Sequence, residues 1–319
     1  MLTRERLENQ QIWVYIVTLI LAALFGLLMP RSAESLGSLI SIIIAFLMYS
    51  MFSQIPFTEL KKSFGNRDFL KALLTVNFVI VPVFVWLLSQ FLPDNQALLI
   101  GFYLVLLTPC IDYVIAFTAL GKGDEKLVLT ATPLLFVVQI LLLPVYLWLF
   151  MGRDAVGIVA PGPFFEAFFG LILLPLAIAL LFQLVARKST VGKKMLDGSG
   201  WLLVPFMALT LFIVVASQVM KLPEYGGQVV QVIPLYIVFM VTMPIVSKYV
   251  AKWFRLDTGA GRALVFSGST RNSLVVLPLA LSLPDIGNFV AAIVITQTII
   301  ELLSELVYIQ AVPGMLVRE

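Results

Sequence analysis

The sequence predicts an all-α integral membrane protein of ten transmembrane helices, arranged as two inverted five-helix repeats in which the fourth and ninth helices are discontinuous. Three observations predict this fold: the composition, the lengths of the apolar runs and the positions of Lys and Arg. Apolar residues make up 61% of the 319 positions and charged residues 12%, whereas soluble domains average about 45–50% and 25%. No polar stretch is long enough to fold as a water-soluble domain, so we expect the function to be carried out within the bilayer.

The apolar runs set the number of expected spans. A helix needs about 20 apolar residues to cross the hydrocarbon core, and ten runs approach that length. We expect spans at residues 12–30, 36–54, 69–92, 97–120, 125–151, 163–186, 200–220, 229–251, 261–282 and 286–310. We expect residues 1–319 to form one transmembrane domain, with repeats at about 12–151 and 163–310. The first run is long for the core of a signal peptide and no small-residue cleavage site follows it, so we interpret it as a span.

The positions of the basic residues predict the orientation of the chain. Of the 21 Lys and Arg residues, 17 fall in the termini and loops on one side of the expected spans, three fall on the other side, and Arg271 lies within a span. Cytoplasmic loops are enriched in Lys and Arg, so we expect a multi-pass protein of the plasma (inner) membrane with both termini in the cytoplasm. Because five spans per half is an odd number, two similar halves have opposite orientations, as in many secondary transporters.

The fourth span of each half contains features that interrupt helices. Pro109 lies in the middle of the first of these spans, where proline removes one backbone hydrogen bond and clashes with the preceding turn. The other carries a run of small and polar residues, 267–273, whose side chains compete for backbone hydrogen bonds. Irregular backbone is tolerated at membrane depth only where it is buried in protein or lines a wet cavity. Interruptions at matching places in two repeats therefore predict the binding site of a transporter.

Arg271, within the ninth span, is the most unusual residue of the chain. Placing Arg at the centre of a membrane helix costs roughly 2.5 kcal/mol on insertion scales, so such a residue normally faces protein or water and has a partner. Asp112 is the acid of the other interrupted segment, and we therefore predict an ion pair between Asp112 and Arg271. A permanent pair would be only a helix clasp, but desolvated ion pairs stabilise proteins poorly compared with apolar packing, which favours a working site.

The candidate site residues come from these two segments and from the last span. We predict that the substrate-binding residues are Thr108, Cys110, Asp112, Ser269, Thr270, Arg271, Asn272 and Ser273. We predict that coupling involves Asp112, Glu301 and Glu305. The two glutamates are one turn apart, where they form either a station for a proton or cation or partners for a neighbouring Lys or a helix end.

Several of these features have structural alternatives. Proline kinks are common in membrane helices, so Pro109 also fits a simple kink. Small residues such as those at 267–269 often serve helix packing. Cys110 also fits a small buried core residue. Asn77, Gln139 and Gln297 are candidates to line the same cavity, and they also fit amides that bond between helices.

The composition disfavours other classes of protein. A single cysteine, Cys110, excludes an internal disulfide, and the absence of histidine removes the commonest metal ligand and the usual general base. We therefore expect no cofactor, no metal site and no enzyme activity. The net charge of +3 is explained by the cytoplasmic loops, so nucleic acid is not expected as a partner. The expected partners are the lipid bilayer, a small-molecule substrate, and protons or sodium as the coupling ion.

Three polar segments are distinctive in combination. They are Thr108-Pro109-Cys110-Ile111-Asp112-Tyr113, Leu120-Gly121-Lys122-Gly123-Asp124 and Phe266-Ser267-Gly268-Ser269-Thr270-Arg271-Asn272-Ser273. Together they resemble the bile acid:sodium symporter superfamily, and within it the chain most resembles the arsenical-resistance (arsenite efflux) permeases. The likeness covers essentially the whole chain. It implies ten spans in two inverted repeats, with the fourth and ninth helices unwound and crossing at the centre.

The resemblance carries over residue by residue. Cys110 matches a cysteine in the fourth span of the arsenite permeases that is proposed to meet the thiophilic metalloid. The sodium symporters have an essential glutamate in the ninth span where this chain has Ser267, and a sodium-contacting glutamine where it has Arg271. A fixed positive charge thus replaces ligands of the cation, and sodium coupling through the usual sites of the family does not carry over.

The leading hypothesis is a secondary transporter that exports arsenite or a related small oxyacid by proton-coupled alternating access. Asp112 then carries the proton, its protonation frees the guanidinium of Arg271 for the oxygens of the substrate, and Cys110 adds a soft ligand. The alternative is a sodium- or proton-coupled symporter of an organic anion, with Arg271 holding a carboxylate. A membrane receptor that uses the buried pair as a latch is less favoured, since the sequence leaves no room for a soluble output domain.

Overall fold

The computed structural model of the chain describes residues 4–55, 65–111, 113–158, 168–187, 189–219 and 222–317. Within these ranges the regular elements are helices, and none of the described residues belongs to a β-strand. The chain divides into two compact units, one made of Met1–Thr58 and Pro161–Gly227 and the other of Glu59–Ala160 and Gln228–Glu319. Each unit thus combines one segment from the first half of the sequence with one from the second.

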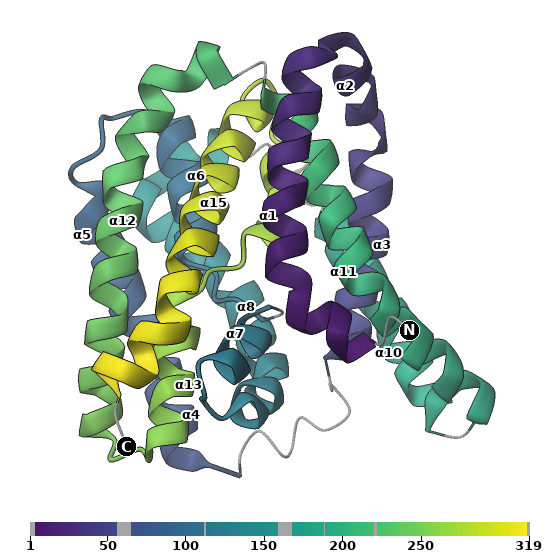
Figure 1. Cartoon of the computed structure of the whole chain (residues 1–319). Helices are drawn as coiled ribbons and strands as arrows, with labels where there is room; N and C mark the ends of the chain where they lie inside the picture. Colours follow the sequence, from purple (N-terminus) through teal and green to yellow (C-terminus); the bar gives the residue numbers. More distant parts are fainter. Residues whose placement is uncertain are drawn as a thin grey trace. The chain divides into compact units, whose positions relative to one another are not determined.

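The first unit is built around the long helix α11. Its elements are α1 (Arg4–Leu28), α2 (Pro30–Leu36), a 3₁₀ turn η1 (Gly37–Leu39), α3 (Ile40–Gln54), a π-helical turn η4 (Phe168–Leu173), α10 (Leu174–Ala186) and α11 (Thr190–Gln218). Both α1 and α3 pack on α11 (Figure 1). Gly26 permits the close approach of α1, because a Cβ there would lie 2.5 Å from the carbonyl oxygen of Ala216. Gln183 of α10 donates to the carbonyls of Phe52 and Ile55, at 3.0 and 2.8 Å, and so satisfies the buried end of α3.

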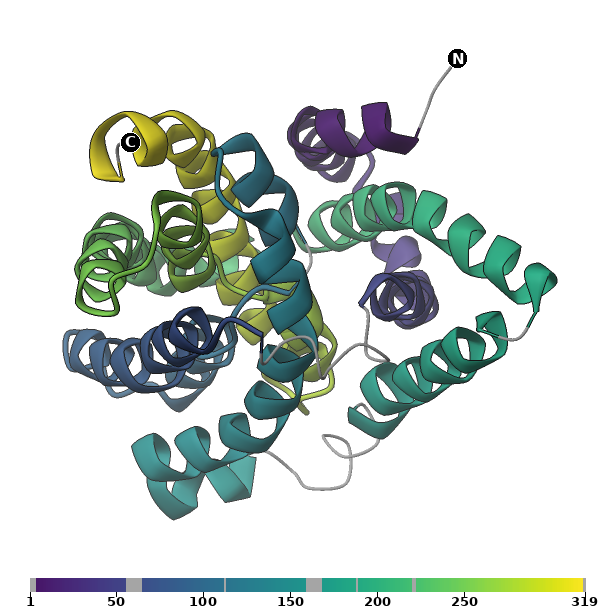
Figure 2. The same cartoon turned by 90° about the horizontal axis from the view of Figure 1, so that it is seen from below.

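The second unit contains the other helices, except that the first residues of α12, up to Gly227, belong to the first unit. They are α4 (Arg67–Thr75), a π-helical turn η3 (Val76–Ile80), α5 (Val81–Ser89), α6 (Gln96–Leu106), α7 (Val114–Leu120), α8 (Glu125–Ile158), α12 (Leu222–Trp253), α13 (Thr258–Ser269), α14 (Ser273–Leu281), α15 (Gly287–Ala311) and a C-terminal π-helical turn η6 (Val312–Leu316). The helix α13 packs on α4, α7 and α8, and α15 packs on α6 and α14 (Figures 1 and 2). Asn66, Asn95, Asp257 and Asn272 cap the starts of α4, α6, α13 and α14 by accepting from the N–H three residues on.

Length and composition identify helices that can cross a membrane. Five are found among the described residues: Arg67–Ser89, Glu125–Gly152, Gly198–Ser217, Gly226–Trp253 and Gly287–Leu316. A sixth is added if Pro30–Leu39 and Ile42–Gln54, bent by 53°, form one broken span. The sequence predicts ten spans, but fewer helices among the described residues are long and apolar enough to cross a membrane alone. The remaining predicted spans correspond to interrupted segments or to shorter apolar helices. The expected start of the sixth span, residues 163–167, and the expected end of the seventh, residue 220, lie outside the described residues.

Exposed apolar side chains cover the outer faces of long helices. On α8, Leu141 and Leu149 are 66% and 62% exposed, and on α12 Val241 is 60% exposed. Large apolar patches are rare on soluble monomeric proteins and mark contact with a membrane or a partner. Together with the apolar helices, these faces indicate a multi-pass membrane protein.

Candidate functional site

The two interrupted segments meet in the second unit, where the chain between α6 and α7 pairs with the chain between α13 and α14. The backbone N–H of Cys110 donates to the carbonyl of Thr270 at 3.1 Å, and the N–H of Asn272 donates to the carbonyl of Thr108 at 2.8 Å. These bonds replace helical bonds that the breaks remove. Backbone groups that cannot reach water must find such partners inside the protein, so the two breaks stabilise each other.

Pro109 and Arg271 face each other at the centre of this contact, as an isolated antiparallel bridge. The hydrogen bonds on either side of the bridge use the neighbours of both residues. Proline therefore loses no bond between the segments here, although it has no N–H to donate. Both interruptions that the sequence predicts are present, and they lie against each other.

Polar side chains complete the helix ends around the breaks. The hydroxyls of Thr108 and Ser269 each donate to the carbonyl four residues earlier, at 2.9 and 2.8 Å. Oδ1 of Asn272 accepts from the N–H of Val275 at 3.2 Å and so caps α14. Such bonds satisfy the last carbonyls of one helix and the first donors of the next. The low helix propensity of these residues is thus used to end and restart the helices.

The side chain of Arg271 is fully buried beside this contact. Its Nη2 donates to Oδ1 of Asn77 and to the carbonyl of Ser267, both at 2.9 Å, and its Nη1 donates to the carbonyl of Leu106 at 3.4 Å. The guanidinium carbon lies 5.5 Å from the centre of the Phe239 ring, within the range of a cation–π interaction. Among the described residues, the guanidinium thus contacts neutral acceptors and an aromatic face.

The helix ends explain why a cation is stable at this position. The carbonyl of Leu106 belongs to the last residue of α6, and that of Ser267 belongs to the last turn of α13. Carbonyls at a helix C-terminus carry partial negative charge that favours a cation. Asn77 lies in the π-helical turn η3, and such turns occur frequently at functional sites. Two broken helices and one distorted helix thus converge on one guanidinium.

Glu301 of α15 bonds to both interrupted segments, and its side chain is fully buried. Its Oε2 accepts from the backbone N–H of Arg271 at 2.8 Å and from Nε2 of Gln297 at 2.6 Å. Its Oε1 accepts from the hydroxyl of Tyr113 at 2.6 Å. Three donors therefore fix this carboxyl group against the break between α13 and α14.

Glu305, one turn further along α15, reaches the same break. It is fully buried, and its Oε1 accepts from the hydroxyl of Thr270 at 2.6 Å. Both glutamates of the last helix therefore contact the interrupted segments. The predicted partner of Arg271, Asp112, lies outside the described residues.

The structure gathers the other predicted residues into one buried cluster. Thr108, Cys110, Ser269, Thr270, Arg271, Asn272, Ser273, Glu301 and Glu305 are all 0–1% exposed. Within the ranges that the structure describes, no three His, Cys, Asp or Glu side chains are grouped so that they could hold a metal ion. The cluster is therefore made of one guanidinium, one thiol, two carboxyl groups, hydroxyls and amides.

Five buried polar atoms of this region have no hydrogen-bond partner among the described residues. Three belong to groups that can donate, Nε of Arg271, Nδ2 of Asn272 and Oγ of Ser273, and two accept, Oε1 of Gln297 and Oε2 of Glu305. A buried polar group without a partner costs about 1–3 kcal/mol, so a solute that bonds to these atoms would be stabilised. The donors suit the oxygens of an acid or anion. The acceptors suit a proton or a cation.

Two residues of the site are not found by sequence reasoning. Phe239 lies in a long apolar run of α12 and differs from its neighbours by no local signal. Tyr113 stands at the edge of a distinctive segment, but only the structure shows that its hydroxyl reaches Glu301. Asn77 and Gln297 are recognisable as amides in apolar spans, yet their contacts with Arg271 and Glu301 become evident only in three dimensions.

Comparison with known proteins identifies the family of the chain. Residues 41–224 match the family model described as Sodium Bile acid symporter family. The match covers more than half of the chain and includes the interruption between α6 and α7. A search of curated proteins gives no match. Members of the matched family are transporters rather than enzymes. This multi-pass helical chain therefore belongs to the sodium bile acid symporter family.

Proposed function

We propose that this protein is a secondary active transporter that binds a small solute where its two interrupted helices cross, and that it exports arsenite or a related oxyacid in exchange for protons. One observation carries the proposal: a fully buried guanidinium lies at two paired helix breaks, and donor and acceptor atoms around it have no partner among the described residues. Charge at membrane depth is costly and marks substrate or ion pathways. A helix clasp alone gives no reason for the unpaired atoms.

The proposed architecture is a single transporter domain of ten spans in two inverted repeats, with residues 12–151 and 163–310 as the repeats. The division into compact units supports it, because each unit combines one segment of the first repeat with the corresponding segment of the second. Both interruptions then fall at the same place in their repeats, as in transporters built this way. The positions of Lys and Arg support a plasma-membrane location with both termini in the cytoplasm.

The substrate-binding residues that we propose are Thr108, Cys110, Asp112, Ser269, Thr270, Arg271, Asn272 and Ser273. The unpaired donors of Arg271, Asn272 and Ser273 would bind the oxygens of the solute, since a planar guanidinium matches an oxyacid or oxyanion. Cys110 is buried in the same cluster, and sulfur is a soft ligand suited to arsenic. This combination supports arsenite as the first candidate and the arsenical-resistance permeases as the branch of the family.

For coupling we propose Asp112, Glu301 and Glu305. Of the two glutamates, Glu305 is the better proton carrier, because one of its oxygens bonds to Thr270 and the other has no partner within the described part of the chain. A proton that binds there changes the charge beside the break, whereas Glu301 is held by three donors. Movement of the break would then depend on the charge of Glu305.

A second candidate function is a sodium- or proton-coupled symporter of an organic anion. The family name names sodium as the coupling ion. The oxygens of Gln297 and Glu305 that have no partner among the described residues are suitable ligands for a cation. In this case Arg271 would hold the carboxylate of the substrate. Flux of arsenite and of a panel of carboxylates in proteoliposomes, with an imposed pH or sodium gradient, decides between the two functions.

Cys110→Ser separates the two classes of substrate. Serine has nearly the same shape but lacks the soft sulfur, so arsenite should lose a ligand while a carboxylate held by Arg271 should not. Loss of one such ligand is worth more than about 1.4 kcal/mol, and we therefore expect arsenite flux to fall at least about tenfold. Carboxylate flux through the same vesicles is the control. Full arsenite flux in the serine variant would dismiss the thiol as a ligand.

Tyr113→Phe tests whether transport needs Glu301 to be fixed at the break. The change removes the donor to Oε1 of Glu301, so we expect a stability loss of about 1–3 kcal/mol together with slower flux. Tyr146→Phe is the matched control, because its hydroxyl donates to the carbonyl of Phe78 at 2.7 Å, between α8 and η3. Thermal unfolding and flux are measured on both variants. If both lose stability equally and both keep full flux, the bond to Glu301 has no role in transport.

A further inference from the structure

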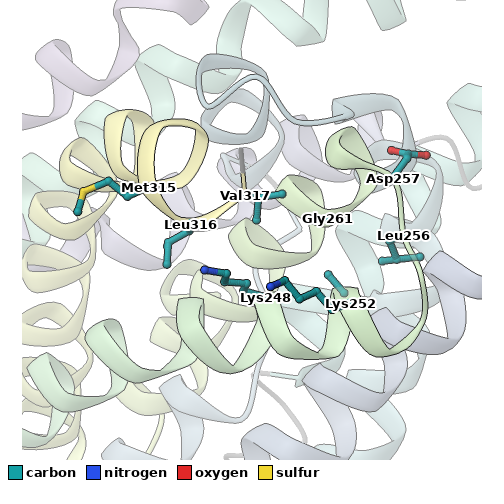
Figure 3. A pocket seen from close by; sticks show the side chains of 9 residues that line it. Lys248, Lys252, Leu256, Asp257, Gly261, Met315, Leu316 and Val317 are labelled. Carbon is teal, nitrogen blue, oxygen red and sulfur yellow. The ribbon is translucent and has the colours of Figure 1, made fainter. Parts of the chain in front are cut away.

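A basic pocket lies between the end of α12 and the C-terminal turn of the second unit. Its volume is about 360 Å³, and its lining includes Lys248, Lys252, Asp257, Leu316 and Val317. Figure 3 shows both lysine side chains extending from α12 toward the turn that carries Leu316 and Val317. The pocket belongs to none of the interrupted segments described above, so the proposed transport site does not explain it.

An apolar groove continues from this pocket along α12 and α15. Its volume is about 330 Å³, and it shares Met315 and Leu316 with the basic pocket. Its walls are mainly aliphatic, with Val241 from α12 and Val307 from α15 as examples. The two hydroxyl groups on the walls, of Ser304 and Tyr308, donate to backbone carbonyls. The groove thus offers an occupant almost no polar partner.

The charges in the pocket favour an anion. Lys248 is partly exposed and Lys252 is exposed, and they are one helical turn apart on the same face of α12. Asp257 is the acid of the lining, and one of its oxygens caps α13 by accepting from the N–H of Ala260 at 2.8 Å. Arg262 donates to the carbonyl of Val317 at 2.9 Å and so anchors the turn over the pocket. Among the described residues that line the pocket, two ammonium groups therefore outnumber one carboxylate, and that carboxylate is partly engaged in the cap.

Aromatic residues place this pocket at the level of the lipid headgroups. Tyr249 and Trp253 alternate with the lysines along α12 and are 64% and 74% exposed. Exposed Trp and Tyr at the end of an apolar helix mark the interface between membrane and water. A molecule that fills both cavities must therefore be anionic at the interface and aliphatic in the hydrocarbon region.

We propose that these two cavities form a binding site for an anionic phospholipid. Lys248 and Lys252 bind the phosphate of the headgroup, and one acyl chain lies in the groove between α12 and α15. The shared residues Met315 and Leu316 surround the point where the headgroup meets the chain. A free phosphate would use only the basic pocket, and a neutral lipid would use only the groove. A molecule that occupies both neighbouring cavities is therefore a charged lipid.

The first experiment compares lipids on the delipidated full chain in neutral detergent. Native mass spectrometry follows titration with palmitoyl-oleoyl phosphatidylglycerol and with the phosphatidylcholine that has the same chains. Each lysine near the surface contributes a modest attraction, and two of them should favour phosphatidylglycerol by roughly tenfold or more. Equal affinities for the two lipids would overturn the proposal.

Two pairs of substitutions then locate the site. Lys248→Gln with Lys252→Gln should abolish the preference for phosphatidylglycerol. Lys71→Gln with Lys126→Gln is the matched control, because it removes the same charge from exposed positions of α4 and α8 in the same unit. We expect the control to keep the preference. Equal losses in both double variants would show only a general effect of charge, and would contradict a defined site.

The last arm separates a lipid from a free anion. Val307→Trp places a large side chain in the groove at a position that is 62% exposed, so it should block the acyl chain without disturbing the core. We expect it to weaken phosphatidylglycerol binding several-fold, and we expect millimolar inorganic phosphate to compete poorly. Full displacement by phosphate, with no effect of the tryptophan, would identify the pocket as a site for a soluble anion instead.

Discussion

Arg271→Gln is expected to reduce transport about a hundredfold or more while the protein still inserts in the membrane. Glutamine lacks the charge and the fork of donors, so it cannot serve Asn77, Ser267 and Leu106 and also bind an anion. A hydrogen bond to a charged group contributes about 1.5–3 kcal/mol, and about 1.4 kcal/mol corresponds to tenfold. The loss of two such bonds in the transport cycle gives an effect of this size. Flux in proteoliposomes with equal amounts of protein measures it.

Arg262→Gln is the matched control for this result. Arg262 is also a buried guanidinium of the second unit, and it donates to the carbonyls of Val317 and Lys122 at 2.9 and 3.1 Å. Its removal should lower stability and leave flux close to that of the wild type. Arg271→Lys should fall between, because it keeps the charge without the planar fork. Flux above half of the wild-type value in Arg271→Gln would remove this residue from the site.

Glu305→Gln is expected to abolish uphill transport driven by a pH gradient and to leave downhill flux largely intact. Glutamine can still accept from Thr270 through its amide oxygen, as Oε1 of Glu305 does, but it can neither bind nor release a proton. The solute should therefore reach equal concentrations on both sides of the membrane and go no further. The measurement is the final accumulation ratio of the solute, compared with its initial rate of entry.

Two controls accompany this variant. Glu125→Gln changes an acid in the first turn of α8, away from the interruptions, and should keep full accumulation. Glu301→Gln should impair both folding and flux, because three donors point at this carboxyl group and an amide cannot accept all of them. Normal pH-driven accumulation in Glu305→Gln would exclude this residue as the proton carrier and would leave Asp112 as the candidate.

Local chemistry makes the interruptions predictable. Proline at 109 and the polar run at 267–273 weaken a helix whatever lies around them, and the chain breaks at both places. The caps also follow from short-range rules, since Asn272 accepts from the N–H three residues on. The number of spans is less accessible from the sequence, because a length rule treats each apolar run as one continuous helix. In the structure, the interrupted segments and the short helices are each shorter than a helix that crosses the membrane without a break.

The surroundings of Arg271 are not predictable from sequence patterns. The sequence suggests Asp112 as its partner, a residue outside the described ranges. The contacts that the structure does describe are with Asn77, two backbone carbonyls and the face of Phe239. Every residue has a backbone carbonyl, so the residue types in the sequence do not show which carbonyls will contact Arg271. Only the convergence of α6 and α13 reveals them. The same holds for Tyr113, which reaches Glu301 across 188 positions of the chain.

In the proposed mechanism, solute and coupling proton meet at one buried crossing. The most direct test is arsenite flux in sodium-free proteoliposomes with an imposed pH gradient, for the wild type, Arg271→Gln and Glu305→Gln. We expect uphill accumulation by the wild type, almost no flux with Arg271→Gln, and equilibration without accumulation with Glu305→Gln. Accumulation that survives in both variants would contradict this mechanism, because solute and proton would then be using a different part of the molecule.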